Sequence, residues 1–361
     1  MIKPTTYRKI SQVIPFGIIF LVSGLLYALL EKGILGEVNY YPSTGLPYDF
    51  EVSLYFGFSV TIVGLAVGII EVLFLKKFFI NKSFRQKIFY KTLIYLSMNY
   101  IFTVVVFPIG TSLDLNYSIL YPRVWEMFLI FITSVTYLSV VLYTAITLVI
   151  SLFYAEMNEN IGHEVLKNFF TGRYHSPIEE ERIFMFLDMK SSTTIAENLG
   201  HVKYFELLRE YYADLSKTII QYSGEIYQYV GDEIVISWKL KNGLRNNNCI
   251  KCFNVMKRNL ESQAEKYIKE FDVVPTFKAG FHVGKVTTGE IGVIKKDIIF
   301  TGDVLNTTAR IQNLCKDYKV DLIISGDLVN MLDFDPEINI KSLGENELRG
   351  RKKNMMLYTI H

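Results

Sequence analysis

The stretch that decides the fold of the C-terminal half is residues 182–197, RIFMFLDMKSSTTIAE. Its first six residues are mostly apolar and fit a buried β-strand, which ends at Asp188. A helix is expected to open at the Ser/Thr run that follows, because Thr194 and Glu197 have the spacing of a capping box. The first backbone amides of that helix, at about residues 190–193, would then be free to bind a phosphate group.

Strands and helices alternate outward from this stretch. The expected helices cover residues 202–222, 251–270 and 304–315, and the expected strands cover 225–230, 233–238, 277–286, 298–300, 320–325 and 355–360. The first two of these strands after Asp188 flank Gly231-Asp232, which is a β-hairpin signal with an acidic tip. An order of this kind predicts a mixed sheet in an α/β or α+β domain.

Two carboxylates, Asp188 at a strand end and Asp232 at a hairpin tip, are the candidate metal ligands. Mg²⁺ prefers carboxylate and phosphate oxygens, and two metal ions can clamp the attacking and leaving oxygens of a phosphoryl transfer. The residues alone leave plainer alternatives open, because Asp188 could cap the following helix and Asp232 could simply form the turn.

Asn306 and Arg310 are four residues apart and share one face of an expected helix. An arginine in that position could neutralise charge on a transferring phosphoryl group. A surface salt bridge is the alternative role for a lone helical arginine.

The N-terminal half has a different composition. Half of the 361 residues are apolar, and nearly all of the long uncharged runs lie before residue 156. Four runs are long enough for transmembrane helices, which need roughly 20 apolar residues; they cover about 10–30, 52–75, 92–113 and 127–154. We therefore predict a transmembrane domain over 1–155, a coupling helix and linker over 156–179, and a domain of ordinary globular composition over 180–361.

The basic residues predict the orientation of these spans. They gather before the first span and between the second and third, at Lys3, Arg8, Lys9, Lys76, Lys77, Lys82, Arg85, Lys87 and Lys91. Both regions are expected on the cytoplasmic side, whereas the acidic loop between the first two spans is expected outside. The chain is then a multi-pass protein of the cell (plasma or inner) membrane, in contact with the lipid bilayer and with both termini in the cytoplasm.

Several function classes are disfavoured. The net charge of +2 gives no reason to expect a nucleic-acid partner. Three cysteines, Cys249, Cys252 and Cys315, are too few for a disulfide framework, and the first two lack the second ligand pair of a zinc site. Transport is disfavoured because Glu71 and Asn99 are the only polar candidates in the spans, and we interpret both as helix-packing contacts.

Four motifs in sequence order resemble the catalytic domain of the class III adenylyl and guanylyl cyclases. They are Phe186-Leu187-Asp188 with its Ser/Thr-rich helix start, Tyr229-Val230-Gly231-Asp232-Glu233, Gly280-Phe281-His282-Val283-Gly284-Lys285-Val286 with Gly289 and Gly292, and Gly302-Asp303-Val304-Leu305-Asn306-Thr307-Thr308-Ala309-Arg310. The resemblance covers about residues 180–361. It implies a ferredoxin-like α+β domain that acts as a head-to-tail homodimer and makes a cyclic nucleotide and pyrophosphate from a nucleoside triphosphate.

The resemblance also implies the residue roles. Asp188 and Asp232, helped by the Met189 carbonyl, would hold two Mg²⁺ or Mn²⁺ ions in each active site. Asn306 would orient the ribose and Arg310 would stabilise the transition state, both from the other subunit. The substrate-binding candidates are Lys190, Ser191, Ser192, Thr193, Gln228, Gly231, Ile299, Thr301 and Arg351.

The base-reading positions depart from the family patterns. Gln228 replaces the lysine or glutamate that is usual there, and Ile299 cannot hydrogen-bond a base, although Thr301 is nearby. Glutamine is both a donor and an acceptor, so it can face either purine. We expect an adenylate cyclase. The alternatives are a guanylate cyclase, a pyrimidine cyclase, and an inactive cyclase-like membrane sensor or scaffold, which the intact Asp188, Asp232, Asn306 and Arg310 disfavour.

Overall fold

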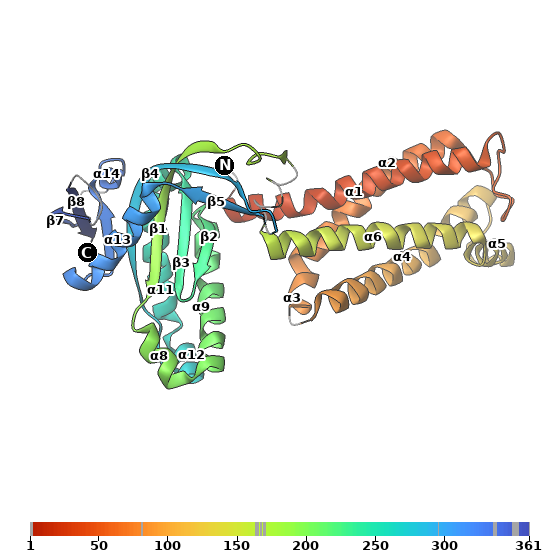
Figure 1. Cartoon of the computed structure of the whole chain (residues 1–361). Helices are drawn as coiled ribbons and strands as arrows, with labels where there is room; N and C mark the ends of the chain where they lie inside the picture. The colour runs from red at the N-terminus through yellow and green to blue at the C-terminus, as the bar shows by residue number, and fades with distance from the viewer. Residues whose placement is uncertain are drawn as a thin grey trace. The chain divides into compact units, whose positions relative to one another are not determined.

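The computed structural model describes residues 3–80, 82–162, 166, 168, 171–294, 296–334, 338–348 and 354–360. The chain divides into two compact units, Thr6–Phe170 and Thr171–His361, which are called here the membrane unit and the catalytic unit. Figure 1 shows the helices of the first unit and the mixed sheet of the second.

Helices make up most of the described part of the membrane unit, and the loop between the first two contains one isolated β-bridge, Tyr40 with Pro47. Its helices are α1 (Pro4–Leu35), α2 (Phe50–Ile70), the π-helical turn η1 (Glu71–Leu75), α3 (Lys76–Phe78), α4 (Phe84–Leu115), α5 (Pro122–Ile132) and α6 (Val135–Ile161). Four helical segments are long and apolar enough to cross a membrane: Pro4–Leu35, Phe50–Phe78, Phe84–Leu115 and Val135–Ile161.

The fourth of these segments differs from the expected 127–154. The expected run is split, because Ser134 caps a new helix by accepting a hydrogen bond from the Tyr137 amide at 3.1 Å. Helix α6 therefore begins at Val135, and its far end continues to Ile161, into the expected coupling helix. Gly162 ends it with a φ of 99°, and most of the residues between there and 170 lie outside the described part of the chain.

A buried ionic cluster joins three of the membrane-unit elements. The Lys91 ammonium lies 2.5 Å from Glu71 Oε1 and 3.0 Å from Glu156 Oε1, and each of the three residues is at most 4% exposed. Lys87 bonds the other oxygen of Glu156 at 3.0 Å. The cluster ties η1, α4 and the end of α6 together, so the interpretation of Glu71 as a helix-packing contact is confirmed.

Replacing Lys91 with methionine should destabilise the membrane unit by about 3 kcal/mol, because it leaves buried carboxylates without their cation. Thermal unfolding of the detergent-solubilised chain measures this loss. Lys77→Met, at an exposed lysine in α3, is the matched control. Adding Glu71→Gln and Glu156→Gln to Lys91→Met should recover part of the loss. Equal melting temperatures for Lys91→Met and Lys77→Met would contradict the cluster.

The catalytic unit is built on one mixed sheet. Its strands are β1 (Ile178–Met189), β2 (Glu225–Val230), β3 (Glu233–Lys239), β4 (Phe277–Ile291), β5 (Asp297–Thr301), β6 (Leu322–Ser325), β7 (Ile340–Asn346) and β8 (Met355–Ile360), in the order β2-β3-β1-β4-β6-β8-β7, with β5 paired to β4. The strand β1 is central and antiparallel to both β3 and β4, whereas β4 and β6 run parallel.

Helices cover both faces of this sheet. They are α8 (Ser192–Leu199), α9 (His201–Gln221), α10 (Leu240–Leu244), the 3₁₀ turn η2 (Arg245–Asn247), α11 (Asn248–Ser262), α12 (Ala264–Phe271), α13 (Asp303–Tyr318) and α14 (Gly326–Val329). Successive residues of a strand point to opposite faces. Accordingly Met185 packs into the core beneath α9 and α11, while Phe184 packs with Val304 of α13 on the other face. This burial on both faces explains the uninterrupted apolar run in β1.

The α+β fold with a mixed sheet is confirmed, and one strand differs in length from expectation. The strand expected over 277–286 continues to Ile291, so the glycine-marked segment after Val286 is part of a long hairpin with β5. His282, in the middle of this strand, is a packed core residue, and its Nδ1 lies 2.8 Å from Ser325 Oγ.

Candidate active site

Strand register brings the two candidate metal ligands together. Asp188 lies near the end of β1, opposite Glu233 of β3 and Lys278 of β4. Asp232 comes directly before Glu233, in the two-residue turn that joins β2 to β3. Gly231 adopts a φ of 62° in that turn, and its carbonyl accepts a hydrogen bond from the Tyr212 hydroxyl at 2.8 Å. The turn is therefore held with its aspartate beside Asp188.

Negative charge accumulates at this end of the sheet. Burial, and then the nearby Asp232 carboxylate, raise the pKa of Asp188. Burial and the same two aspartates raise the pKa of Glu233 to about 7. Carboxylates in such surroundings are stabilised in their charged form by a cation. The donor set is thus of the chemical type that binds Mg²⁺ or Mn²⁺.

Two further side chains contact Asp188 that the sequence analysis did not find. Lys278 Nζ lies 3.2 Å from Asp188 Oδ2, and Gln312 Nε2 of α13 donates to the same oxygen at 3.1 Å. Their positions depend on the pairing of β1 with β4 and on the packing of α13, neither of which has a local sequence signal. Within the described chain, Lys278 forms an ion pair with the aspartate pair through Asp188.

The carboxylate pair does not form a complete metal site by itself. Across the described residues, no group of three or more His, Cys, Asp or Glu side chains is placed to hold a metal ion. Mg²⁺ commonly uses one or two protein carboxylates and fills its other positions with water and substrate phosphate. Asp188 and Asp232 fit that pattern. The Met189 side chain is buried, and the role of its carbonyl stays a prediction.

The predicted phosphate-binding segment follows the aspartate directly. Helix α8 begins at Ser192, preceded by Ser191 with a φ of 57° and without a side-chain cap. The capping box expected at Thr194 is therefore wrong, because the helix starts at Ser192, three residues earlier than that spacing requires. Ser191 and Thr193 are exposed, and Ser192 is partly buried.

The Lys190 side chain, a candidate for substrate binding, forms an ion pair within the catalytic unit. Its ammonium pairs with one oxygen of Asp321, and Lys257 bonds the other oxygen at 2.6 Å. The backbone amide of Lys190 donates to the Thr276 carbonyl at 2.9 Å. The side chain is therefore anchored at the end of the sheet.

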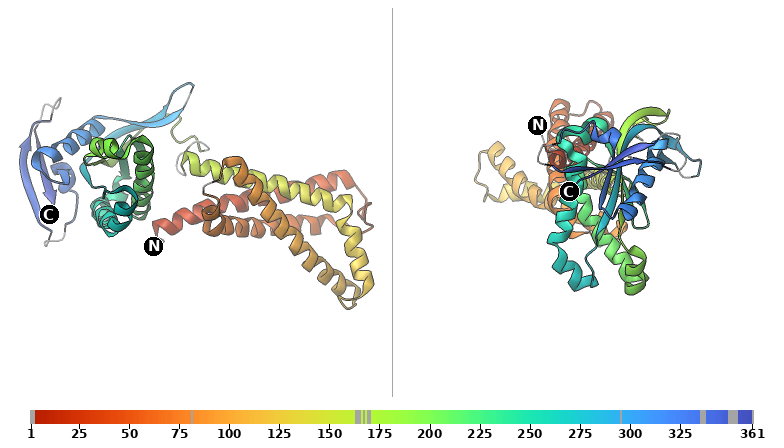
Figure 2. Two further views of the ribbon diagram at one scale, coloured as in Figure 1. Left: turned by 90° about the horizontal axis from the view of Figure 1, so that it is seen from below. Right: turned by 90° about the vertical axis from the view of Figure 1, so that its left-hand side faces the viewer.

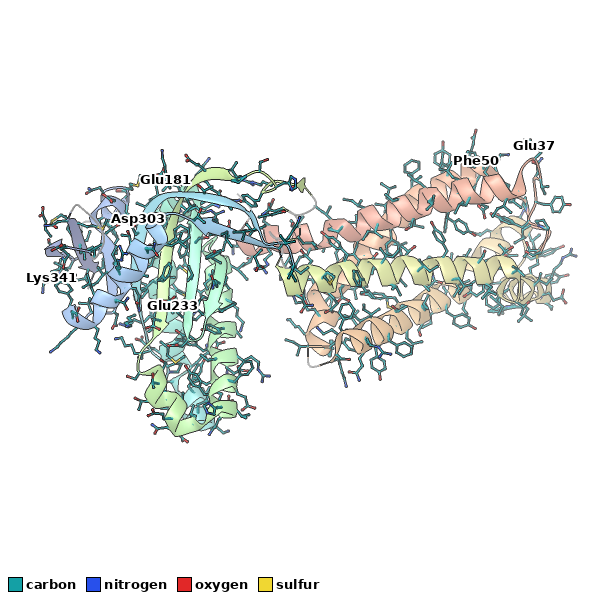
Figure 3. The ribbon with its side chains drawn as sticks, viewed as in Figure 1. Glu37, Phe50, Glu181, Glu233, Asp303 and Lys341 are labelled. Carbon is teal, nitrogen blue, oxygen red and sulfur yellow. The ribbon has the colours of Figure 1, made fainter. Side chains whose placement is uncertain are left out.

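The other two candidate catalytic residues lie on α13. In Figure 3, Asp303 at the start of this helix lies near Glu181. Glu233, next to the aspartate pair, lies toward the other end of the strands. Within the described chain, no hydrogen bond or ion pair joins Asn306 or Arg310 to the aspartate pair. Asn306 is exposed, and the Arg310 Nη1 is buried without a hydrogen-bond partner. One chain thus holds two separate halves of the predicted site.

The base-reading candidates lie on two strands that meet. The Phe300 amide donates to the Tyr227 hydroxyl at 3.2 Å, and the two rings are 4.7 Å apart. This contact brings the neighbouring positions Gln228 of β2 and Ile299 of β5 into one region. Gln228 is exposed, whereas Ile299 is partly buried.

The remaining two substrate candidates have different outcomes. The Thr301 hydroxyl donates to the Thr287 carbonyl at 3.3 Å, within the β4–β5 hairpin, and the residue is exposed. Arg351 lies outside the described residues, so its predicted contact with the triphosphate stays a prediction.

Comparison with known proteins places the catalytic unit. The family model described as the adenylate and guanylate cyclase catalytic domain matches residues 175–361. Adenylate cyclase 2 of Rhizobium meliloti (strain 1021) is 33% identical over 223 residues, which cover 62% of this chain and 61% of that protein. Adenylate cyclase 1 of the same organism is 26% identical over 191 residues, or 50% of this chain and 27% of that protein.

A solved structure of a bacterial light-regulated adenylyl cyclase matches the fold with a TM-score of 0.51 and 18% identity, over 58% of this chain and 61% of that one. The chain spans less than two thirds of the length of each of these relatives. The family model nevertheless covers more than half of this chain and includes every motif around the aspartate pair. This chain therefore belongs to the adenylate and guanylate cyclase catalytic-domain family.

Proposed function

We propose that this chain is a membrane-bound adenylate cyclase, which converts ATP to 3′,5′-cyclic AMP and pyrophosphate as a homodimer. The observation that carries the proposal is the close pair Asp188 and Asp232, in the fold of a cyclase family, with surplus negative charge around it. The names of the two Rhizobium relatives support adenine as the base.

The aspartate pair is the proposed metal site. Two Mg²⁺ or Mn²⁺ ions bound there would supply activation of the ribose 3′-hydroxyl and neutralisation of the triphosphate charge. Asp188 and Asp232 would hold the metal ions in a fixed position, because β1 and the hairpin turn fix the two aspartates. Lys278 lies beside Asp188 and can turn its ammonium to a phosphate oxygen. The Lys190 amide is taken by the Thr276 carbonyl, so the further donors to the same phosphates would be the first backbone amides of α8 itself.

The homodimer is proposed because the half-sites are separate in one chain. Within the described chain, the Arg310 Nη1 is buried and has no hydrogen-bond partner, and an unsatisfied buried donor costs stability. A bound anion would accept its hydrogen bond. A head-to-tail pair would set Asn306 and Arg310 of one copy against the aspartates of the other. Asn306 would then orient the ribose, and Arg310 would stabilise the charge that develops at the α-phosphate.

Attachment to the cell membrane is proposed from the four long apolar helices. The basic residues that flank them favour cytoplasmic termini, which puts the catalytic unit where nucleoside triphosphates are available. Guanylate cyclase activity is the second candidate, because Gln228 is exposed and can pair with either purine.

The test is an assay of the full chain in lipid nanodiscs with Mn²⁺ and, separately, ATP, GTP, CTP and UTP. Cyclic products are identified by mass spectrometry, and Asp232→Ala is the inactive control. Cyclic AMP as the main product, absent from the control, is the expected result. Cyclic GMP or a cyclic pyrimidine nucleotide would overturn the choice of substrate. No cyclic product from a folded, dimeric sample would favour the inactive scaffold.

The metal-free catalytic unit should lose stability as the pH rises. The folded-state pKa of Glu233, about 7, lies above its ordinary value of 4.5. The stabilising contribution of this group is therefore complete below pH 4.5 and is lost as the pH rises through 7. Mn²⁺ binding should offset the repulsion, so the melting temperature should rise more with Mn²⁺ at pH 8 than at pH 5.

The fluorescence of Trp238, which is buried in the catalytic core, reports this unfolding. Asp232→Asn is the matched control: it should raise the metal-free melting temperature at pH 8 and remove most of the Mn²⁺ effect. A Mn²⁺ effect of unchanged size in Asp232→Asn would show that the cation binds elsewhere.

A further inference from the structure

The tip of the β4–β5 hairpin exposes apolar side chains completely. Val293 and Ile294 are 98% and 104% exposed relative to an extended reference, and Ile291 is 57% exposed. They are followed in the sequence by two lysines, of which the structure describes Lys296. Adjacent aliphatic side chains that are wholly in solvent suggest a contact with another apolar phase.

The β4–β5 hairpin projects beyond the central part of the sheet. Pairing of β4 with the central strand β1 ends at Ile178 and Thr288, whereas its pairing with β5 continues to Ile291 and Asp297. The last residues of β4 are thus held by β5 and by the segment that precedes β1. Figure 2 shows the hairpin extending beyond the rest of the catalytic-unit sheet.

The hairpin also lies beside the place where the chain enters the catalytic unit. The Glu290 amide donates to the Tyr174 carbonyl at 3.1 Å, and Pro177 packs against Gly289. Only residues 162–173 separate Tyr174 from Ile161, the last residue of α6. These residues can span at most about 45 Å when fully extended. The linker therefore sets an upper limit on the distance between Tyr174, which holds the hairpin, and the end of a proposed transmembrane helix.

The charges around the tip are mixed. Lys296 and His175 both face Glu290, at 3.8 Å and 3.9 Å from its Oε2, and Asp297 begins β5. Exposed Arg173 lies over the Tyr174 ring at 5.5 Å. Basic side chains next to an apolar tip suit the boundary between lipid headgroups and acyl chains, because their stems lie along the apolar region while the charges stay in water.

The small area of the tip favours lipid over protein as its partner. A stable protein interface buries about 800 Å² on each partner, which three aliphatic side chains do not approach. Insertion into a bilayer needs no complementary surface and is favoured in proportion to the apolar area buried.

We propose that the hairpin tip, Ile291, Val293 and Ile294, inserts into the headgroup–acyl boundary of the bilayer and is a second attachment of the catalytic unit to the membrane. The proposal rests on the membrane anchoring proposed above. The attachment would limit rotation of the catalytic unit about its single covalent linker.

Site-directed spin labelling tests this directly, because the native cysteines Cys249, Cys252 and Cys315 are all buried. Val293→Cys is introduced into the full chain, labelled with a nitroxide and reconstituted in lipid nanodiscs. The accessibility of the label to O₂, which concentrates in lipid, is compared with its accessibility to a water-soluble nickel chelate. We expect the label at residue 293 to favour O₂.

Two control positions make the result interpretable. Val202→Cys, at a 77% exposed valine at the start of α9, should favour the nickel chelate. Leu142→Cys, at an exposed leucine within α6, should favour O₂ if that helix spans the bilayer.

The outcomes separate the two proposals. Nickel accessibility at residue 142 would refute the membrane anchoring itself. Lipid accessibility at residue 142 together with nickel accessibility at residue 293 would overturn the insertion of the tip alone. A label at residue 293 that reaches neither reagent would also overturn it, and would point to a contact with protein, such as a second copy of this chain.

Discussion

The catalytic unit depends on one unfavourable interaction, the approach of the Asp188 and Asp232 carboxylates. Strand register forces it: Asp188 lies opposite Glu233, and the preceding residue of the tight turn is Asp232. The turn keeps this geometry because Gly231 accepts a positive φ and the Tyr212 hydroxyl bonds its carbonyl. Charge repulsion of this kind is tolerated where a bound cation relieves it, and the adjacent cation Lys278 relieves only part of it.

Helix α13 (Asp303–Tyr318) packs along the sheet, and its residue Gln312 contacts Asp188 at the charged end. Its close packing on β4 needs glycine, because a Cβ on Gly280 would overlap the backbone of Gln312. The same packing lets the Gln312 amide reach Asp188. Asn306 and Arg310, on other positions of the helix, make no bond to that aspartate within the described chain. The fold therefore holds both sets of the predicted site residues, but no hydrogen bond or ion pair joins them within the described chain.

The sequence predicted the features with local signals. The apolar run before Asp188, the glycine of the hairpin turn and the amphipathic helix after Gly200 all have their expected structures. Lys278 and Gln312 were missed because their proximity to Asp188 depends on pairing between segments far apart in the chain. The capping box failed for a local reason: with Ser191 in a left-handed conformation, the chain turns into α8 before Thr194.

In the membrane unit, too, the helices could be predicted from local sequence, whereas contacts between distant residues could not. Its long apolar helices are evident from composition, whereas the bonds from Lys91 to Glu71 and Glu156 join residues that are 20 and 65 positions apart. The cluster holds the end of α6, the helix that leads toward the catalytic unit. Any signal that reaches the catalytic unit through α6 must act on an element that is fixed by buried charge.

The measurement that tests the account most directly mixes two inactive variants. Asp188→Asn removes a proposed metal ligand, and Arg310→Ala removes the proposed transition-state contact. If the site is shared between copies, a mixed dimer retains one intact site. An equal mixture, co-expressed so that the subunits pair at random, should then recover about one quarter of the wild-type cyclase activity. Failure of the mixture to exceed either variant, with mixed dimers present, would contradict a site formed between two chains.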